Sequence, residues 1–181
     1  MDDDRSAELF RSVVMPHLAD GLALARWLAG NVTDAEDIVQ DAAIKALRAV
    51  TRFDGGNPRA WVLAIVRNTA FSWFAKHRPK ALVMVGGLAE IDEATYGDEP
   101  QPDLGPETPE ATLIRRADAS MVEAAIAELP LPFREILVFR DINGLSYREI
   151  ADLLNVPMGT VMSRLSRARA RLATRLAEKD K

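Results

Sequence analysis

The chain has 181 residues, 27 acidic and 23 basic side chains, a net charge of −4 and no cysteine. Its length suits one medium-sized domain or two small ones, and its overall negative charge argues against a nucleic-acid-binding protein. The lack of cysteine excludes disulfides, thiolate metal sites and cysteine nucleophiles. The acidic N-terminus is unlike a signal peptide, and no apolar run is long enough to span a membrane. We therefore expect a cytoplasmic protein.

The first predicted element is an amphipathic helix over residues 6–29. Its apolar side is formed by Leu9, Phe10, Val13, Val14, Leu18, Leu22, Ala25 and Leu28. Pro16 lies in the middle of this stretch, where proline removes a backbone hydrogen bond. We therefore expect the helix to be kinked or split there.

A second helix is predicted from Asp34 to about Val50, opened by a capping box of Thr33 and Glu36. Asp34, Asp37 and Asp41 recur at i, i+3 and i+7, which gives one exposed acidic edge. The helix dipole favours acids in the first turn, but Asp41 lies too far along the helix for that explanation. The edge is therefore a candidate interaction surface.

Residues 51–57, TRFDGGN, form a glycine-rich loop before a third helix from Pro58 to about Lys76, with Asn57 as its cap. This helix carries Trp61, Phe71, Trp73 and Phe74. Aromatic residues at helical spacing are usually core. Aromatic side chains beside a basic loop can also stack on unpaired bases, while basic side chains contact the phosphates of the nucleic-acid backbone. Both interpretations of these aromatic residues stay open.

Residues 81–112 are predicted to be an acidic linker rich in proline and glycine. Between Ala81 and Glu110 there are eight acidic residues and no Lys or Arg. The rest of the chain then has 19 acidic against 23 basic side chains. Dividing the charge in this way reverses the first inference, because two positively biased blocks, residues 1–80 (the N-terminal block) and 113–181 (the C-terminal block), flank the linker.

The C-terminal block reads as a helix-turn-helix. A helix over 133–140 ends in a turn at Gly144, and Ser146 and Glu149 form a capping box for a helix that breaks at Asn155-Val156-Pro157. A last helix begins near Gly159, and one side of it carries hydroxyl and basic side chains: Thr160, Ser163, Arg164, Arg167 and Arg171. Arginines on the second helix of such a motif contact guanine or phosphate in the major groove. We favour this interpretation over an ordinary helical hairpin with a solvated surface.

Two other classes of function explain less of the sequence. A stand-alone helix-turn-helix regulator explains the C-terminal block, but not the acidic edge or the glycine-aromatic loop. An enzyme is not expected, because His17 and His77 are the only histidines and no phosphate-binding loop, zinc motif or nucleophile elbow is present. We expect no metal and no cofactor.

Three stretches together resemble the extracytoplasmic-function (ECF) sigma factors of the sigma-70 family of bacterial RNA polymerase. They are DAEDIVQDAAIKALRAV (34–50), NPRAWVLAIVRN (57–68) and LSYREIADLLNVPMGTVMSRLSRARARL (145–172). The resemblance implies an all-α fold of two small helical domains, sigma region 2 and region 4, joined by the linker. It also implies an alternative sigma factor for promoter-specific transcription initiation in a stress or signal response.

The resemblance assigns functions to individual residues. Docking to the core polymerase is assigned to Asp34, Asp37, Gln40 and Asp41. Recognition of the −10 element, including a flipped base, is assigned to Arg52, Phe53, Asp54, Gly55, Arg59, Trp61, Arg67 and Asn68. Recognition of the −35 element is assigned to Thr160, Ser163, Arg164, Arg167 and Arg171.

The resemblance also implies partners. These are the β′ coiled coil and β flap of core RNA polymerase, promoter DNA and an anti-sigma factor, without membrane insertion. Met162 stands where many members carry Lys or Arg, so one phosphate contact of the family is not expected here.

Overall fold

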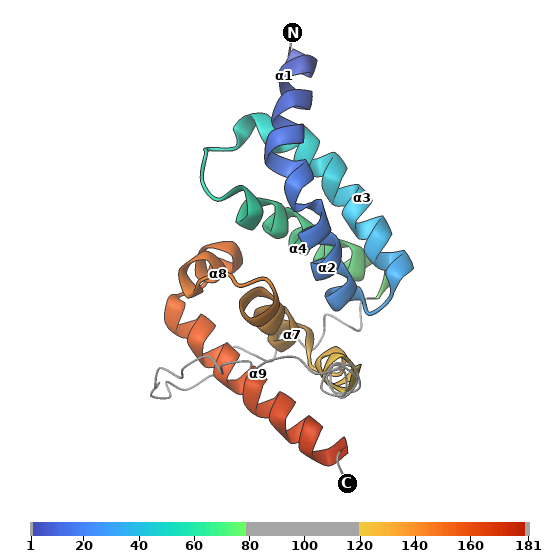
Figure 1. Ribbon diagram of the computed structural model, residues 1–181, viewed down its shortest axis with the longest axis vertical. Coiled ribbons are helices and arrows are strands. Elements are labelled where there is room, and N and C mark those ends of the chain that lie inside the picture. Colours follow the sequence, from blue (N-terminus) through green and yellow to red (C-terminus); the bar gives the residue numbers. More distant parts are fainter. Residues whose placement is uncertain (1, 79–119, 180–181) are drawn as a thin grey trace, which may run out of the picture.

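The computed structural model describes residues 2–78 and 120–179, and within them every regular element is helical (Figure 1). This confirms the all-α prediction for the described parts of the chain. The predicted acidic linker, residues 81–112, lies outside the described residues.

The N-terminal block begins with two helices separated by irregular turns. Helix α1 spans Asp2–Leu9, followed by a π-helical turn over Phe10–Val14, a 3₁₀ turn over Met15–His17 and helix α2 over Leu18–Ala29. Pro16 lies in the 3₁₀ turn, where its missing N–H costs no α-helical hydrogen bond. The predicted split at Pro16 is confirmed.

Helix α3 spans Val32–Ala49 and begins earlier than predicted. Its cap is Asn31, whose Oδ1 accepts a hydrogen bond from the Asp34 N–H at 2.9 Å. The predicted capping box of Thr33 and Glu36 is therefore wrong. The reason is that α2 ends at Gly30, with φ +75°, which leaves Asn31 in extended backbone one residue later.

Helix α4 spans Pro58–His77 and is capped as predicted, because Asn57 Oδ1 accepts from the Ala60 N–H at 3.2 Å. Helices α2, α3 and α4 all pack on one another to form a three-helix bundle (Figure 1). A Cβ at Gly21 of α2 would lie 3.0 Å from Val66 Cγ2 of α4. Glycine at this position therefore allows α2 and α4 to approach closely.

The C-terminal block contains a helix over residues 120–127, α7 over Leu131–Leu137, a π-helical turn over Val138–Ile142, α8 over Tyr147–Leu154 and α9 over Met158–Lys179. The predicted turn is confirmed by Gly144, with φ +67°. The predicted capping box is also confirmed, since Ser146 Oγ accepts from the Glu149 N–H and Glu149 accepts from the Ser146 N–H. Asn155, with φ +53°, separates α8 from α9.

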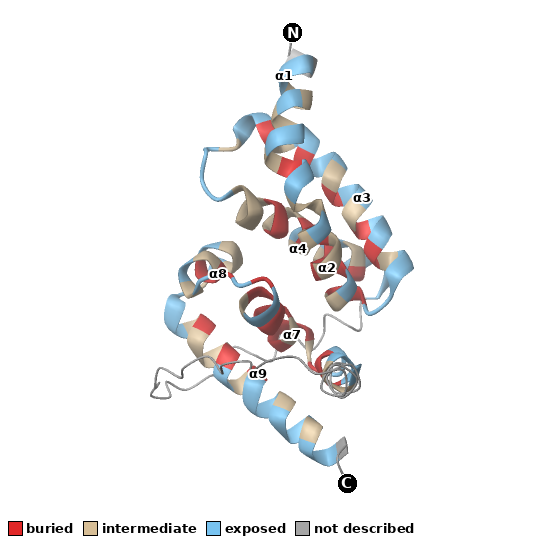
Figure 2. Ribbon diagram, viewed as in Figure 1, coloured by how far each residue is buried: buried red, intermediate tan, exposed pale blue. Residues whose placement is uncertain are grey.

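The two blocks share one hydrophobic core. Helices α2 and α4 contact α7 and α8, respectively, and buried residues lie on the sides of α2, α4 and α7 that face each other (Figure 2). Arg134 of α7 strengthens this contact by donating to the Leu28 carbonyl of α2 at 3.1 Å. The described residues therefore form one packed body.

Candidate nucleic-acid interface

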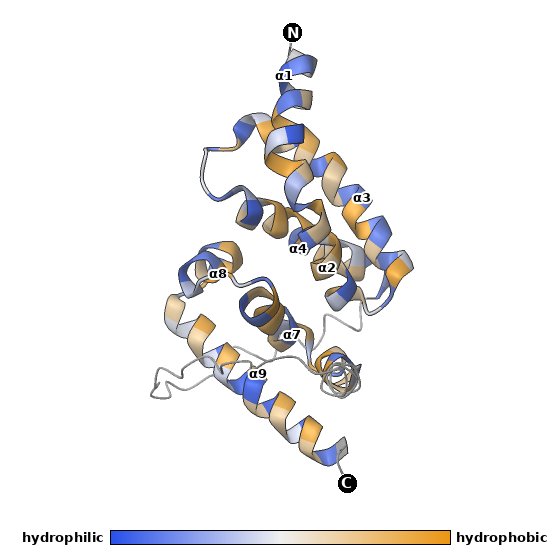
Figure 3. Cartoon of the chain, in the orientation of Figure 1, coloured by the Kyte–Doolittle hydropathy of each residue, from blue (hydrophilic) through white to orange (hydrophobic). Residues whose placement is uncertain are grey.

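The outer side of α3 carries an exposed acidic face, as predicted for Asp37 and Asp41, and Gln40 is exposed beside them. Hydrophilic and hydrophobic residues alternate along this helix (Figure 3). Ile44 and Leu47 continue the same face and are 45% and 43% exposed. The predicted acidic edge does not include these two residues, although their positions at i+7 and i+10 from Asp37 place them on the same side of the helix. These two side chains add apolar surface beside the exposed carboxylates of α3.

Asp34 differs from the other acidic residues of α3. Its carboxylate forms an ion pair with Arg78 and accepts a hydrogen bond from Asn31 Nδ2 at 2.7 Å. The Asp34 side chain is only 19% exposed. The expected exposed edge is therefore correct for Asp37 and Asp41 and wrong for Asp34, which joins the start of α3 to the end of α4.

The glycine-rich loop holds an aromatic pair beside an ordered turn. The rings of Phe53 and Trp61 lie 5.3 Å apart between centroids, tilted by 54°. Asp54 Oδ1 accepts from the Gly56 N–H at 3.1 Å, and Gly55 has φ +84°, which favours glycine. Arg52 is exposed at the start of the loop. Phe53 and Trp61 are each partly exposed, so one part of this aromatic pair packs against the protein and another part faces solvent.

The polar residues at the start of α4 contact the C-terminal block. Arg59 Nε donates to Asp20 of α2 at 2.6 Å, and Arg59 Nη1 donates to the backbone carbonyl of Asn143. Asn57 Nδ2 donates to Glu149 Oε1 of α8. These contacts were not predicted, because the partners lie far apart in the sequence.

Arg67 makes a contact with two parallel hydrogen bonds. It donates from Nε to Glu135 Oε2 at 2.8 Å and from Nη2 to Glu135 Oε1 at 3.2 Å. Its guanidinium also lies 4.2 Å from the ring centroid of Phe71, and it donates to the exposed Asn68. Burial raises the pKa of Glu135, opposed by the hydrogen bonds and charge of Arg67 and by the charge of Arg164. Glu135 needs this cation, since a buried carboxylate is costly without a partner.

Glu149 has the opposite electrostatic environment. Hydrogen bonds from the backbone and hydroxyl of Ser146 lower its pKa, with smaller contributions from Asn57 and Arg59. Its carboxylate is therefore held ionised at the junction of α8 with α4.

The basic side of α9 is partly engaged within the C-terminal block. Thr160, Ser163, Arg164 and Arg167 are half-buried, and Arg171 is exposed. The Arg171 guanidinium lies 4.5 Å from the ring centroid of the buried Phe133. The buried Nε of Arg164 finds no hydrogen-bond partner among the described residues. The predicted separation of the arginine side from the packing side is therefore incomplete.

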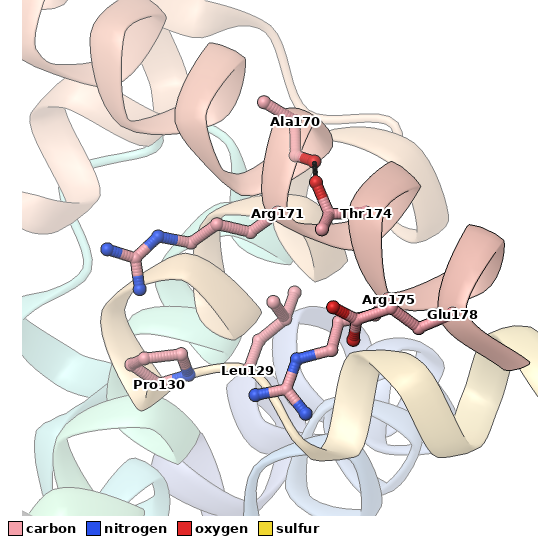
Figure 4. A pocket seen from close by; sticks show the side chains of 7 residues that line it. All are labelled: Leu129, Pro130, Ala170, Arg171, Thr174, Arg175 and Glu178. Carbon is pink, nitrogen blue, oxygen red and sulfur yellow. Dashed lines mark hydrogen bonds between the residues drawn. The ribbon is translucent and has the colours of Figure 1, made fainter.

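A groove of about 270 Å³ lies between α9 and the start of α7 (Figure 4). Leu129 and Pro130 line one side, and Arg171 and Arg175 extend from α9 toward them. Arg175 Nη1 donates to Glu128 Oε2 at 2.7 Å. Within residues 2–78 and 120–179, no group of three or more His, Asp or Glu side chains is placed to hold a metal ion, and no helix is long and apolar enough to cross a membrane.

Comparison with known families assigns each block separately. Residues 13–79 match the model of sigma-70 region 2, and residues 119–172 match that of sigma-70 region 4. The chain is 36% identical over 139 residues to the RNA polymerase sigma-H factor of Pseudomonas aeruginosa, covering 75% of this chain and 69% of that protein. It is 32% identical over 176 residues to the ECF RNA polymerase sigma factor SigE of Mycolicibacterium smegmatis, covering 97% of this chain and 65% of SigE.

A solved structure agrees with these matches. The sigma factor RpoE of Bartonella quintana, in complex with the anti-sigma factor NepR, is 28% identical with a TM-score of 0.67, covering 95% of this chain and 98% of that one. The two family models match the two helical blocks in the expected order. The chain therefore belongs to the ECF sigma factors of the sigma-70 family.

Proposed function

We propose that this chain is a promoter-specificity subunit that binds core RNA polymerase in the cytoplasm and has no catalytic activity of its own. The observation that carries the proposal is the match of region 2 and region 4 to the two blocks, in that order. The curated relative SigE is longer, since the chain spans 65% of its length.

The acidic face of α3 is the proposed docking surface for the β′ coiled coil of the polymerase. Asp37 and Asp41 supply negative charge, and the exposed Ile44 and Leu47 supply apolar area beside it. Apolar contacts at the centre with charges around them are typical of specific protein interfaces. The C-terminal block is proposed to bind the β flap.

The loop over 52–57 and the start of α4 are proposed to hold the melted −10 strand. Phe53 and Trp61 offer aromatic surface for base stacking, which contributes about 1–3 kcal/mol per base. Arg52, Arg59 and Arg67 offer donors for phosphates, and Asn68 is exposed one residue further along α4. Extrusion of a base costs a few kcal/mol, so a site for the extruded base assists melting as well as recognition.

Helix α9 is proposed to enter the major groove at the −35 element. Thr160, Ser163, Arg164, Arg167 and Arg171 share one side of this helix, as the positions of a recognition helix do. Because the Arg171 guanidinium stacks on Phe133 and the Nε of Arg164 is buried, we infer that Arg167 makes the first contact.

Control by an anti-sigma factor is part of the proposal. It is supported by the similarity to the Bartonella quintana sigma factor RpoE, whose solved structure is a complex with the anti-sigma factor NepR.

Run-off transcription tests the proposed function. Core polymerase is mixed with the purified chain and genomic fragments, and we expect discrete transcripts that are absent without the chain. The stand-alone regulator would instead bind duplex DNA by itself and neither bind core polymerase nor start transcripts. That outcome would replace the proposal with the alternative.

A further inference from the structure

Glu135 of α7 lies close to both of the helices that are proposed to read DNA. Helix α7 packs against α9 within the C-terminal block and contacts α2 of the N-terminal block (Figure 1). The Glu135 carboxylate is buried and accepts two hydrogen bonds from Arg67 of α4, at 2.8 and 3.2 Å. Burial raises the pKa of this carboxylate, and the hydrogen bonds and charge of Arg67, followed by the charge of Arg164 on α9, lower it. A cation from each proposed reading helix therefore acts on the same acid.

Arg164 has an unused hydrogen-bond donor on its buried side. Its Nε is buried and has no hydrogen-bond partner in the described parts of the chain, although the residue as a whole is half-buried and reaches the surface. The Arg171 guanidinium, seven residues further along α9, lies 4.5 Å from the ring centroid of Phe133 of α7. Residues seven apart share one side of a helix, so Arg164 faces α7 as Arg171 does.

The carboxylate and the unused donor complement each other. In the promoter complex Arg67 is proposed to turn to the −10 strand, and this removes both of its hydrogen bonds from Glu135. The carboxylate then lacks a donor from α4, while Arg164 Nε lacks an acceptor. Hydrogen bonds between a guanidinium and a carboxylate are among the strong ones in proteins, and an unpaired buried donor is costly. Both groups therefore gain when Glu135 exchanges Arg67 for Arg164.

Such an exchange fixes the direction of the Arg164 guanidinium. A guanidinium is planar and presents donors on more than one edge, so a carboxylate that takes the Nε edge leaves Nη donors for another acceptor. A side chain held in this way before binding loses less conformational freedom when it contacts DNA. The order of Arg164 then depends on a residue of α7 that does not itself touch DNA.

We propose that Glu135 is a positioning residue for −35 recognition. Its carboxylate takes the Nε of Arg164 once Arg67 has turned to the −10 strand, and it holds the guanidinium with Nη donors directed at the −35 duplex. The inference deepens the proposed function and rests on it, because it takes Arg67 as a −10 contact and α9 as the −35 reader. Glu135 thereby couples the two contacts, since engagement of the −10 strand orders a side chain that reads the −35 element.

The first measurement follows the Arg164 Nε–H signal by nuclear magnetic resonance in the free, isotope-labelled chain. Arg67→Ala removes the competing cation, so this proton should move downfield and exchange with water about tenfold more slowly than in the wild type, because a bond to a charged acceptor protects it. Glu135→Met in addition replaces the acceptor by an apolar side chain of similar volume and should abolish both changes. A signal that is the same in all three chains would overturn the proposal.

The second measurement tests recognition in the assembled complex. Holoenzyme made from core polymerase and the chain is titrated with a fluorescent promoter fragment found by run-off transcription. Glu135→Met should weaken binding about tenfold, the loss expected for one misplaced arginine contact. Glu128→Met is the matched control, because Glu128 also accepts from an arginine of α9, and it should leave the affinity unchanged.

The same comparison in an Arg164→Ala chain separates positioning from structure. Glu135→Met should have no further effect there, because Glu135 acts on DNA only through Arg164. A merely structural role would weaken binding by the same factor in both backgrounds, and that result, like an unchanged affinity of the single variant, would overturn the proposal. Thermal unfolding followed by circular dichroism checks that each variant is folded.

These outcomes are separable from failure of the proposed function. Active run-off transcription, together with an unaltered Arg164 signal or with equal losses in both backgrounds, removes the positioning role alone. Inactive run-off transcription removes the proposed function, whereas the Arg164 signal of the free chain still reports whether Glu135 exchanges its partner.

Discussion

Arg67 of α4 and Glu135 of α7 form a bidentate salt bridge, in which Arg67 Nε lies 2.8 Å from Glu135 Oε2 and Arg67 Nη2 lies 3.2 Å from Glu135 Oε1. They are 68 positions apart in the sequence, and the Glu135 side chain is 2% exposed. This pair joins region 2 to region 4 at the helix proposed to read the −10 element. It therefore holds the two blocks together at a side chain that is proposed to contact DNA.

A double-mutant cycle of Arg67→Ala and Glu135→Ala should give a coupling free energy of about 1–3 kcal/mol, because contacting charges in one buried pair are not independent. Urea unfolding followed by circular dichroism measures it. The exposed pair Arg175–Glu128, at 45% and 43% exposure, is the control and should couple by less than about 1 kcal/mol. Equal coupling in both pairs would contradict a special role for Arg67 and Glu135.

Glu149 should stabilise the chain at neutral pH and lose that effect in acid. Hydrogen bonds from Ser146 lower its folded pKa below the ordinary 4.5, so its contribution is complete above 4.5 and disappears as the pH falls through the folded pKa. The midpoint of urea unfolding, measured against pH, should therefore fall less steeply in acid for Glu149→Gln than for the wild type. Parallel profiles would show that Ser146 does not hold the carboxylate.

Glu135 should have the opposite pH dependence. Burial raises its folded pKa above 4.5, so the folded state binds the proton more tightly, and its contribution is complete below 4.5 and is lost as the pH rises through the folded pKa. The stability of the wild type relative to Glu135→Gln should then decrease with rising pH above 4.5. An increase over that interval would mean that Arg67 outweighs burial.

Gly21→Ala should destabilise the N-terminal block by about 1–3 kcal/mol, because the new methyl group would lie 3.0 Å from Val66 Cγ2 and force α2 and α4 apart. Thermal unfolding measures the loss. Gly159→Ala is the matched control, since nothing lies within 4 Å of its added Cβ and its stability should rise by about 0.4–1 kcal/mol. A lower melting temperature for Gly159→Ala, or an unchanged melting temperature for Gly21→Ala, would refute this account of the helix contact.

The acidic residues of α3 should separate by function. Asp37→Asn with Asp41→Asn should weaken binding to core polymerase without changing stability, because both side chains are exposed. Asp34→Asn should instead cost about 0.5–1 kcal/mol of stability, since it breaks the ion pair with Arg78. Unfolding and pull-down with core polymerase report the two effects, and the reverse pattern would return Asp34 to the docking surface.

Features governed by neighbouring residues could be predicted from the sequence. The caps at Asn57 and Ser146, the turn at Gly144 and the break at Pro16 each depend on a few adjacent positions. The start of α3 could not be predicted, because Asn31 and Thr33 are both good caps and the end of α2 at Gly30 decides between them. The division of charge along the chain could likewise be predicted, because it depends only on the positions of the charged residues in the sequence.

The packing of the two blocks could not be predicted. It depends on pairs such as Arg67–Glu135 and Asn57–Glu149, which lie 68 and 92 positions apart and carry no periodic signal. The large sequence separation also explains why the sequence pattern indicates only DNA binding for Arg59 and Arg67, although both residues contact region 4 as well.

The separation between the two blocks, with and without core polymerase, tests the central claim most directly. The chain has no cysteine, so Ala75→Cys on α4 and Ala173→Cys on α9, both exposed, accept a donor and an acceptor dye for energy transfer. We predict one short separation in the free chain and a longer one in the transcribing complex. A free chain already as extended as the bound one, or an unchanged separation in an active complex, would contradict the claim that the two blocks stay packed on each other until the polymerase is bound.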